Sequence, residues 1–371
     1  MPLEIRLINP SEYPVVNDFY NHTSHINRPA PATPRSFSEF CWEFVNCPNG
    51  GVIYAGAWET EEGKSPILVG VQCVLMLTMI DTNGKPVKTA KGEATLIDFK
   101  ATIRYKKRDI LKELLDLLIE DCRGKGIEFL WGLNNIPASY KRLGFETPFK
   151  SYHGILVLNP FKAHKNIAAL KSKNTGKSRF KIALFSVLSY LLFSIKKINI
   201  NSNKMHYRIC QGLNENQTLF RHADASGKLL FLLQDSNYLK WRISENPYPI
   251  IYKSYELRDM NDMLVAQVIC SIQKDVAFIE QTLFDKKINK KIIRFLLKNI
   301  LHSLKKEGTC LVRCTSFQHN QLNKEEMKIL KNIGFTYTGK GEWFTFKSLL
   351  NNSGMKPENI YLSRMYKQGI N

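Results

Sequence analysis

A basic turn in the first half of the chain carries the side chains best suited to bind phosphate groups. It precedes residues 109–124, whose apolar positions repeat with helical spacing. Positive side chains at a helix N-terminus can hold phosphates, but Asp109 is a good N-cap whose carboxylate would occupy the same place. The turn is therefore either a phosphate site or a solvated surface before a well-capped helix. Its basic residues are Arg104, Lys106, Lys107 and Arg108.

The elements that position this turn follow from the hydrophobic pattern of the preceding and following segments. Three consecutive strands, 51–58, 66–80 and 94–103, are predicted directly before the turn, and the pair Asn83-Gly84 marks a hairpin at 81–85. A serine that can cap a helix stands at position 36. The predicted order is strand 4–8, helices 10–23 and 36–45, strands 51–58, 66–80 and 94–103, helix 109–124, strand 127–131, helix 137–143 and a strand after Gly144.

The second half of the chain repeats this order, which predicts a duplicated fold. A tryptophan followed six positions later by proline occurs in each half, at 42–48 and 241–247, inside matching predicted helices. Gly144 and Gly334 each close the last helix of their half, which is ordinary C-cap chemistry. The predicted elements are strand 207–211, helices 214–225 and 236–244, strands 250–257, 263–273 and 276–283, helix 289–307, strand 309–314, helix 324–333 and a final strand.

This order of elements resembles the GNAT N-acyltransferase fold, present twice in tandem. The resemblance implies an α/β fold of the mixed α+β kind, with two GNAT-like domains joined by a basic, partly apolar linker. The expected parts are a first domain at 1–158 that would bind acyl-CoA, a linker at 159–204, and a second, degenerate domain at 205–371.

The most specific local match lies between Asn134 and Phe145, which resembles the family's N…Y-x-x-L-G-F pattern. The resemblance implies that Asn134 or Asn135 contacts the pantetheine arm of acyl-CoA and that Tyr140 lies near the thioester sulfur. A phenol there can protonate the departing thiolate as a general acid. The alternative is that Tyr140 only packs on its helix beside Phe145.

The same resemblance assigns the basic turn to the pyrophosphate of acetyl-CoA or another acyl-CoA. The family's turn has two glycines where this chain has Lys107 and Asp109, and a Cβ at 107 is unfavourable if the turn needs a positive φ. Amine attack on a thioester also needs a base. Asp98 is the first candidate, although it could be an outward strand residue, and Glu93 and Glu146 are others. The residues implied for acyl-CoA binding are Ile103, Arg104, Lys106, Lys107, Arg108, Ile110, Asn134 and Asn135.

The second half lacks most of these features. Its equivalent turn, 285–291, has no glycine, and Leu330 stands at the position that corresponds to Tyr140. Asn323 is close to the place of the family's asparagine. We therefore expect this half to serve as a binding and packing partner. No set of residues in the chain has metal-ligand spacing, so no metal is expected.

The net charge of +20 belongs to residues 151–371, because residues 1–150 carry equal numbers of basic and acidic side chains. A basic surface suits an anionic or lipid-linked amine acceptor, such as a sugar or envelope-glycan precursor. It would also suit RNA, as in an aminoacyl-tRNA-dependent transferase of the Fem type. Against nucleic acid, the nearby aromatic residues look like core residues and not like a base-stacking platform.

An apolar stretch at 182–195 lies between basic residues and is too short to span a bilayer, which takes about 20 residues. A helix there could lie on an anionic membrane surface, through residues 162–197, or pack between the domains. The N-terminus has no signal-peptide pattern, and the scattered cysteines indicate reduced thiols. The expected location is cytoplasmic, with membrane contact at the inner face, and a non-catalytic adaptor at that surface is the other interpretation.

Overall fold

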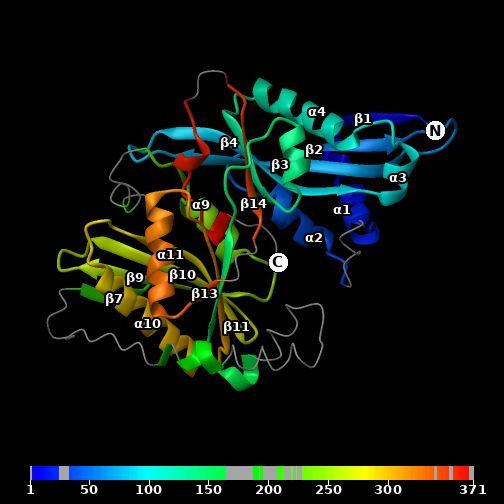
Figure 1. Cartoon of the computed structure of the whole chain (residues 1–371). Helices are drawn as coiled ribbons and strands as arrows, with labels where there is room; N and C mark the ends of the chain where they lie inside the picture. The colour runs from blue at the N-terminus through cyan, green and yellow to red at the C-terminus, as the bar shows by residue number, and fades with distance from the viewer. Residues whose placement is uncertain are drawn as a thin grey trace.

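The computed structural model describes residues 2–24, 33–163, 187–191, 193–194, 207–212, 219, 223, 228–337, 341–350 and 354–366. Its strands form two seven-stranded mixed sheets (Figure 1). The first sheet has the order β1 (Leu3–Leu7), β2 (Val52–Glu59), β3 (Ile67–Ile80), β4 (Pro86–Ile97), β5 (Phe129–Asn134) and β14 (Trp343–Ser348), with β8 (Phe231–Leu232) beside β3. The second has the order β13 (Thr336–Tyr337), β6 (Tyr152–Val157), β12 (Leu311–Ser316), β11 (Val276–Phe284), β10 (Leu264–Gln273), β9 (Ile251–Asp259) and β7 (Tyr207–Gln211).

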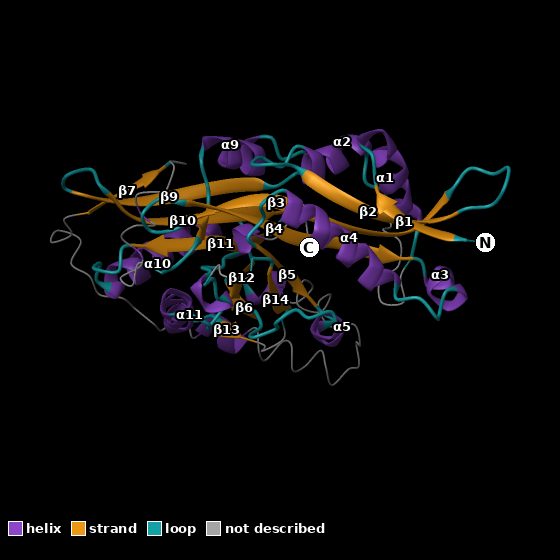
Figure 2. Ribbon diagram, turned by 90° about the horizontal axis from the view of Figure 1, so that it is seen from above, coloured by secondary structure: helices purple, strands orange, loops and turns teal. Residues whose placement is uncertain are grey.

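Helices cover both faces of the sheets (Figure 2). On the first sheet, α4 packs its apolar stripe, which includes Leu114 and Leu118, against one face, while Val16 and Phe19 of α1 lie in the core on the other face. The mixed α/β architecture predicted from the sequence is confirmed. The helices of the first half are α1 (Tyr13–His22), α2 (Phe37–Phe40), α3 (Phe99–Arg104), α4 (Ile110–Gly124) and α5 (Pro137–Arg142); those of the second are α9 (Ser236–Leu239), α10 (Lys290–Lys306) and α11 (Gln321–Ile333).

The two sheets exchange strands. β6, from the first half of the chain, pairs antiparallel with β12 and β13 of the second sheet. In return β14, near the end of the chain, pairs along the whole of β5 in the first sheet, and Figure 1 shows it among the strands of the first half. The sheets therefore do not follow the ranges 1–158 and 205–371, since each contains a strand from the other half.

A pair of tryptophans joins the two halves symmetrically. α2 and α9 each continue into a π-helical turn, at Cys41–Val45 and Lys240–Ser244, which carries the tryptophan of the repeated spelling. Trp42 Nε1 donates to the carbonyl of Trp241 at 2.8 Å, and Trp241 Nε1 donates to the carbonyl of Trp42 at 2.7 Å. Both rings are buried and their centroids are 5.6 Å apart. Reciprocal contacts of this kind are the structural counterpart of the predicted repeat.

The hairpin at 81–85 is confirmed, but the strand predicted at 94–103 is wrong. The side chain of Asp81 accepts from the backbone N–H of Asn83 and of Lys85, each at 2.8 Å, and the hairpin joins β3 to β4. The strand after it begins at Pro86 and ends at Ile97. Asp98 then caps α3, a short helix whose presence the sequence analysis missed.

Most of the linker 159–204 lies outside the described residues. Of the predicted helix 182–195, the described residues 187–191 and 193–194 are helical. Ser189 Oγ accepts from the backbone N–H of Val157 at 3.3 Å, and Phe193 is buried beside His302. This segment therefore packs against β6, a strand of the second sheet, and against α10. Among the described helices, none is long and apolar enough to cross a membrane.

Candidate active site

β4 and β5 are neighbouring parallel strands that diverge. Their pairing extends only from Thr89, opposite Phe129, to Lys91, opposite Trp131. Both strands continue past this point, to Ile97 and Asn134. A cavity of about 20 Å³ lies in the opening between them, which is room for about one water molecule. It is lined by Gln72, Gly92, Gly132, Asn134, Tyr140 and Thr345, among others.

Two glycines allow the close approach at the base of this opening. A Cβ added to Gly132 would lie 3.2 Å from the carbonyl oxygen of Gly92 and 3.4 Å from Thr345 Oγ1, whereas one added to Gly92 would lie 3.8 Å from the nearest heavy atom. Gly132 is the more restricted of the two. Thr345 belongs to β14, so the exchanged strand of the second half supplies part of the lining. Thr345 is more than 200 residues from Asn134 in sequence, and no local signal links it to this site.

A β-bulge interrupts β4 beside the cavity. Cys73 of β3 faces Glu93, and Val71 faces Leu96, so Ala94 and Thr95 together oppose Gln72. Ala94 has φ +49°, a conformation that costs a non-glycine residue about 1 kcal/mol or more. A bulge withdraws backbone groups from the regular ladder, and strained backbone of this kind is concentrated at functional sites.

Gln72 fixes the bulge from the cavity side. Its Nε2 donates to the carbonyl oxygens of Cys73, at 2.8 Å, and of Glu93, at 3.0 Å. Its Oε1 accepts a hydrogen bond from the Thr95 hydroxyl. From the opposite face, the Tyr20 hydroxyl donates to the Ala94 carbonyl at 2.5 Å. The bulge is thus held by side chains on both faces of the sheet.

Tyr140 and Asn134 line the cavity together. Tyr140 lies on α5 with its hydroxyl 3.4 Å from Thr95 Oγ1, and its ring contacts Phe145 edge to face at 5.3 Å. Burial raises the pKa of the phenol, so it keeps its proton at neutral pH. Asn134 Oδ1 accepts from the backbone N–H of Ile136 at 3.1 Å, while its Nδ2 is buried and has no hydrogen-bond partner among the described residues. A buried, unpaired amide N–H₂ at a cavity wall is a ready donor for a ligand carbonyl.

The other candidates are placed differently. Asn135 is exposed in the turn after β5. Asp98 is partly buried, and its carboxylate accepts from the backbone N–H of Lys100 at 3.2 Å as the cap of α3; it does not line the cavity. Glu146 is exposed. Glu93 does not line the cavity either. It lies next to the bulge, on the face of the sheet that it shares with Cys73 and that is opposite to Gln72, and forms an ion pair with the buried Lys91.

Two of the four basic residues in the turn are neutralised within the first half. Arg104 pairs with Glu59, and Arg108 pairs with Glu113 and donates to the carbonyl of Leu3 at 2.6 Å. Ile103 is 57% exposed on α3, whereas Ile110, the first residue of α4, is buried in the core.

Lys106 and Lys107 are exposed and form no ion pair within the described ranges. Lys107 is not among the described residues with positive φ, so its Cβ causes no backbone strain of that kind. Asp109 accepts from the backbone N–H of Lys112 at 3.2 Å and pairs with Arg142. The carboxylate that would repel a phosphate is thus paired with a guanidinium.

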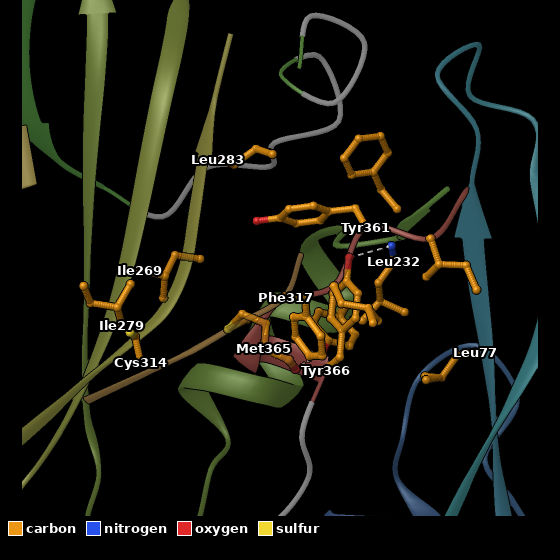
Figure 3. Packing of buried hydrophobic residues seen from close by; sticks show 14 of the residues in the cluster. Leu77, Leu232, Ile269, Ile279, Leu283, Cys314, Phe317, Tyr361, Met365 and Tyr366 are labelled. Atoms are coloured by element: carbon orange, nitrogen blue, oxygen red, sulfur yellow. Dashed lines mark hydrogen bonds between the residues drawn. The ribbon is translucent and has the colours of Figure 1, made fainter. Parts of the chain in front are cut away.

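In the second half the corresponding opening is filled by the chain itself. β11 and β12 pair from Val276, opposite Leu311, to Ile279, opposite Cys314. Beyond this point the segment 360–366 packs in, with every side chain buried (Figure 3). Asn323 Nδ2 donates to the carbonyl of Leu362 at 2.8 Å. The other hydrogen bonds are Asn320 Nδ2 to the Ile360 carbonyl at 3.0 Å, the Tyr361 hydroxyl to the Thr282 carbonyl at 3.4 Å, and the Leu232 N–H to the Tyr366 hydroxyl at 3.1 Å.

No protein-family model and no curated protein matches the chain. Solved structures match over nearly its whole length. A conserved protein of unknown function from Enterococcus faecalis V583, described as a probable N-acyltransferase, has a TM-score of 0.60 at 7% identity, over 94% of this chain and 73% of its own. A tandem GNAT protein from the clavulanic acid biosynthesis pathway has a TM-score of 0.50 at 12% identity, over 94% and 99%.

A third match is the N-myristoyltransferase of Saccharomyces cerevisiae, solved with bound myristoyl-CoA. Its TM-score is 0.55 at 12% identity, over 99% of this chain and 89% of that one. These similarities agree with the order of elements in each half. The chain therefore has the GNAT fold twice in tandem.

Proposed function

We propose that the protein is an acyl-CoA-dependent N-acyltransferase whose active site is the opening between β4 and β5. The observation that carries the proposal is the buried, unpaired Nδ2 of Asn134 beside the Tyr140 hydroxyl in one cavity. Asn134 would donate to an amide carbonyl of the pantetheine arm. The exposed Lys106 and Lys107 would hold phosphate groups of the nucleotide end as point charges.

The reaction is direct attack of an amine nitrogen on the thioester carbonyl carbon. The backbone N–H groups at the Ala94 bulge would stabilise the oxyanion that develops on the carbonyl oxygen. As the carbon–sulfur bond breaks, the Tyr140 hydroxyl would give its proton to the departing thiolate. We assign the base that takes the amine proton to Glu93 in preference to Asp98, because Glu93 adjoins the bulge and Asp98 caps α3.

The charge distribution supports an anionic or lipid-linked amine acceptor, since the +20 net charge is carried by residues 151–371. Amino sugars that bear a phosphate or carboxylate are the first compounds to screen. The release of CoA thiol in their presence, compared with neutral amino sugars, would measure this preference.

The first experiment is calorimetric titration of the full chain with acetyl-CoA and CoA. We expect binding that weakens about tenfold or more in Lys106→Ala/Lys107→Ala, because two charge-assisted contacts are lost. The matched control is Lys286→Ala/Lys287→Ala, which removes the same charge from the equivalent exposed turn of the second half. Equal weakening in both variants would mean that binding follows overall charge. If the folded protein bound neither acetyl-CoA nor CoA, the proposal would be refuted. The adaptor and the tRNA-dependent transferase would then be the interpretations to test.

A second experiment separates binding from chemistry. Asn134→Ala should weaken acetyl-CoA binding about tenfold, because it removes the free amide donor. Tyr140→Phe should bind acetyl-CoA normally. In the presence of an accepted amine it should release CoA thiol about 100-fold more slowly, as expected for loss of a general acid. Normal turnover by Tyr140→Phe would leave this residue with only its packing contact on Phe145.

A further inference from the structure

The short helix at 187–194 presents an apolar face outward. Val187, Leu188 and Leu191 are 45%, 51% and 44% exposed, while Ser189 and Phe193 are buried against the protein. In an amphipathic helix on the surface of a protein, the apolar side normally faces the core. Here Phe193 and the small polar Ser189, which accepts a hydrogen bond from β6, face the protein, yet three further apolar side chains remain on the outer side.

A second exposed apolar group lies close by. Phe161, in the short helical segment 160–163, is 92% exposed, the largest value among the exposed large apolar side chains described. Its segment and the helix at 187–194 meet in one cluster, where Ala163 and Tyr190 pack near Leu311. The two green segments lie near one another at the lower end of the molecule in Figure 1. We call Phe161, Val187, Leu188 and Leu191 the apolar face.

The surroundings of the apolar face are basic. α10, which packs against the same helix, has no acidic residue. Its Lys305 lies with Nζ 4.8 Å from the centroid of the Tyr190 ring and 3.3 Å from the Tyr190 hydroxyl. Lys162 is exposed next to Phe161. Residues 151–205 contain ten basic side chains and no acidic one. Apolar side chains set among cations complement the interface of an anionic bilayer, where headgroups meet acyl chains.

We propose that the apolar face docks the protein on an anionic lipid bilayer, with Phe161, Leu188 and Leu191 entering the acyl-chain boundary and Lys162 and Lys305 at the headgroups. The helix would lie in the surface, since no described helix is long and apolar enough to cross the membrane. This inference does not rest on the proposed acyl transfer. The helical segments that carry the docking residues pack beside β6 and β12 of the second sheet, and none of these residues lines the cavity between β4 and β5.

The test is flotation of the purified full chain with vesicles of phosphatidylglycerol and phosphatidylcholine in equal parts, compared with phosphatidylcholine alone. We expect binding to the anionic vesicles only, decreasing as salt rises. Leu188→Glu/Leu191→Glu should lower the bound fraction about tenfold or more, since glutamate keeps helix propensity but cannot enter the acyl region. Phe193 is buried and unsuitable for such a test.

The control is Val15→Glu/Ile67→Glu, which changes two similarly exposed apolar side chains on the first half, 44% and 58% exposed. It should bind vesicles like the unaltered protein. Equal loss in the control would attribute the effect to added negative charge and overturn the proposal. It would also be overturned if the unaltered protein ignored anionic vesicles. A dimer that only Leu188→Glu/Leu191→Glu dissociates, in the absence of vesicle binding, would make the apolar face a protein interface.

Discussion

Replacing Glu326 with glutamine should stabilise the protein near neutral pH and have a smaller effect in acid. Glu326 lies on α11 with 4% of its surface exposed, beside Asn323, Tyr361 and the backbone of Thr282. It forms no ion pair with any part of the chain that the structure describes, and burial raises the pKa of its carboxyl group to about 8.

The magnitude follows from proton linkage. In the unfolded chain this carboxyl group has its ordinary pKa of 4.5. Between pH 4.5 and about pH 8 the carboxyl group is protonated in the native protein and ionised in the unfolded chain, so unfolding releases a proton. The free energy of unfolding therefore falls by about 1.4 kcal/mol for each unit by which the pH rises. From about pH 5.5 to about pH 7.5 the native protein therefore loses about 2.5 kcal/mol through this residue, slightly less than two full units of slope because the native carboxyl group begins to ionise near pH 7.5. Glutamine has no proton to release, so Glu326→Gln avoids that loss.

The assay is urea unfolding followed by circular dichroism at the two pH values. The stability difference between Glu326→Gln and the unaltered protein should grow by about 2.5 kcal/mol on going to the higher pH. Glu325→Gln is the control, because Glu325 precedes it on α11 and forms a partly exposed ion pair with Lys290 at 2.7 Å. Parallel pH profiles for Glu326→Gln and the unaltered protein would show that Glu326 ionises normally and would refute the reasoning.

Three further changes test other parts of the structure, all by urea unfolding. Trp42→Phe should cost about 2 kcal/mol, because it leaves the buried Trp241 carbonyl without its indole donor; an unchanged midpoint would deny the reciprocal contact. Ala94→Val should cost about 2 kcal/mol while Ala94→Gly stays within about 1 kcal/mol, since only glycine adopts φ +49° without strain; equal costs would argue against the bulge. Burial lowers the pKa of His319 from 6.5 to about 4, so the unfolded chain gains a proton first on acidification. The free energy of unfolding of the unaltered protein should therefore fall by about 2 kcal/mol from about pH 7.5 to about pH 5 through this residue. His319→Gln should not show this part of the fall.

The tandem fold could be predicted because each half repeats the same local signals. The Asn83-Gly84 hairpin, the amphipathic stretch that became α4 and the repeated tryptophan all act over short distances in sequence. The strand exchange could not be predicted in the same way. β6 and β14 are six-residue strands whose own apolar patterns do not specify a sheet, and only the packing of the whole chain selects the neighbours of each.

The candidate site was predictable where it depends on a turn with a recognisable sequence. Asn134 ends β5 and Tyr140 lies on α5, on either side of such a turn, and both line the cavity. The bulge was missed, because alanine at 94 gives no local signal for a positive φ. Asp98 was read as a strand residue, although an aspartate before a stretch such as Phe99–Arg104 also fits an N-cap. Thr345 could enter the site only through the strand exchange.

The asymmetry between the two halves follows from what fills each opening. Diverging parallel strands leave polar groups away from the ladder, and buried polar groups need partners. In the second half the chain supplies them, because Asn323 is satisfied by the Leu362 backbone and Leu330 needs no partner. The exchange of β14 makes this possible, since the chain leaves the first sheet at Ser348 and the segment 360–366 packs between the halves. In the first half Asn134 Nδ2 has no such partner among the described residues. The strand exchange that supplies Thr345 to one opening thus also places the segment that fills the other.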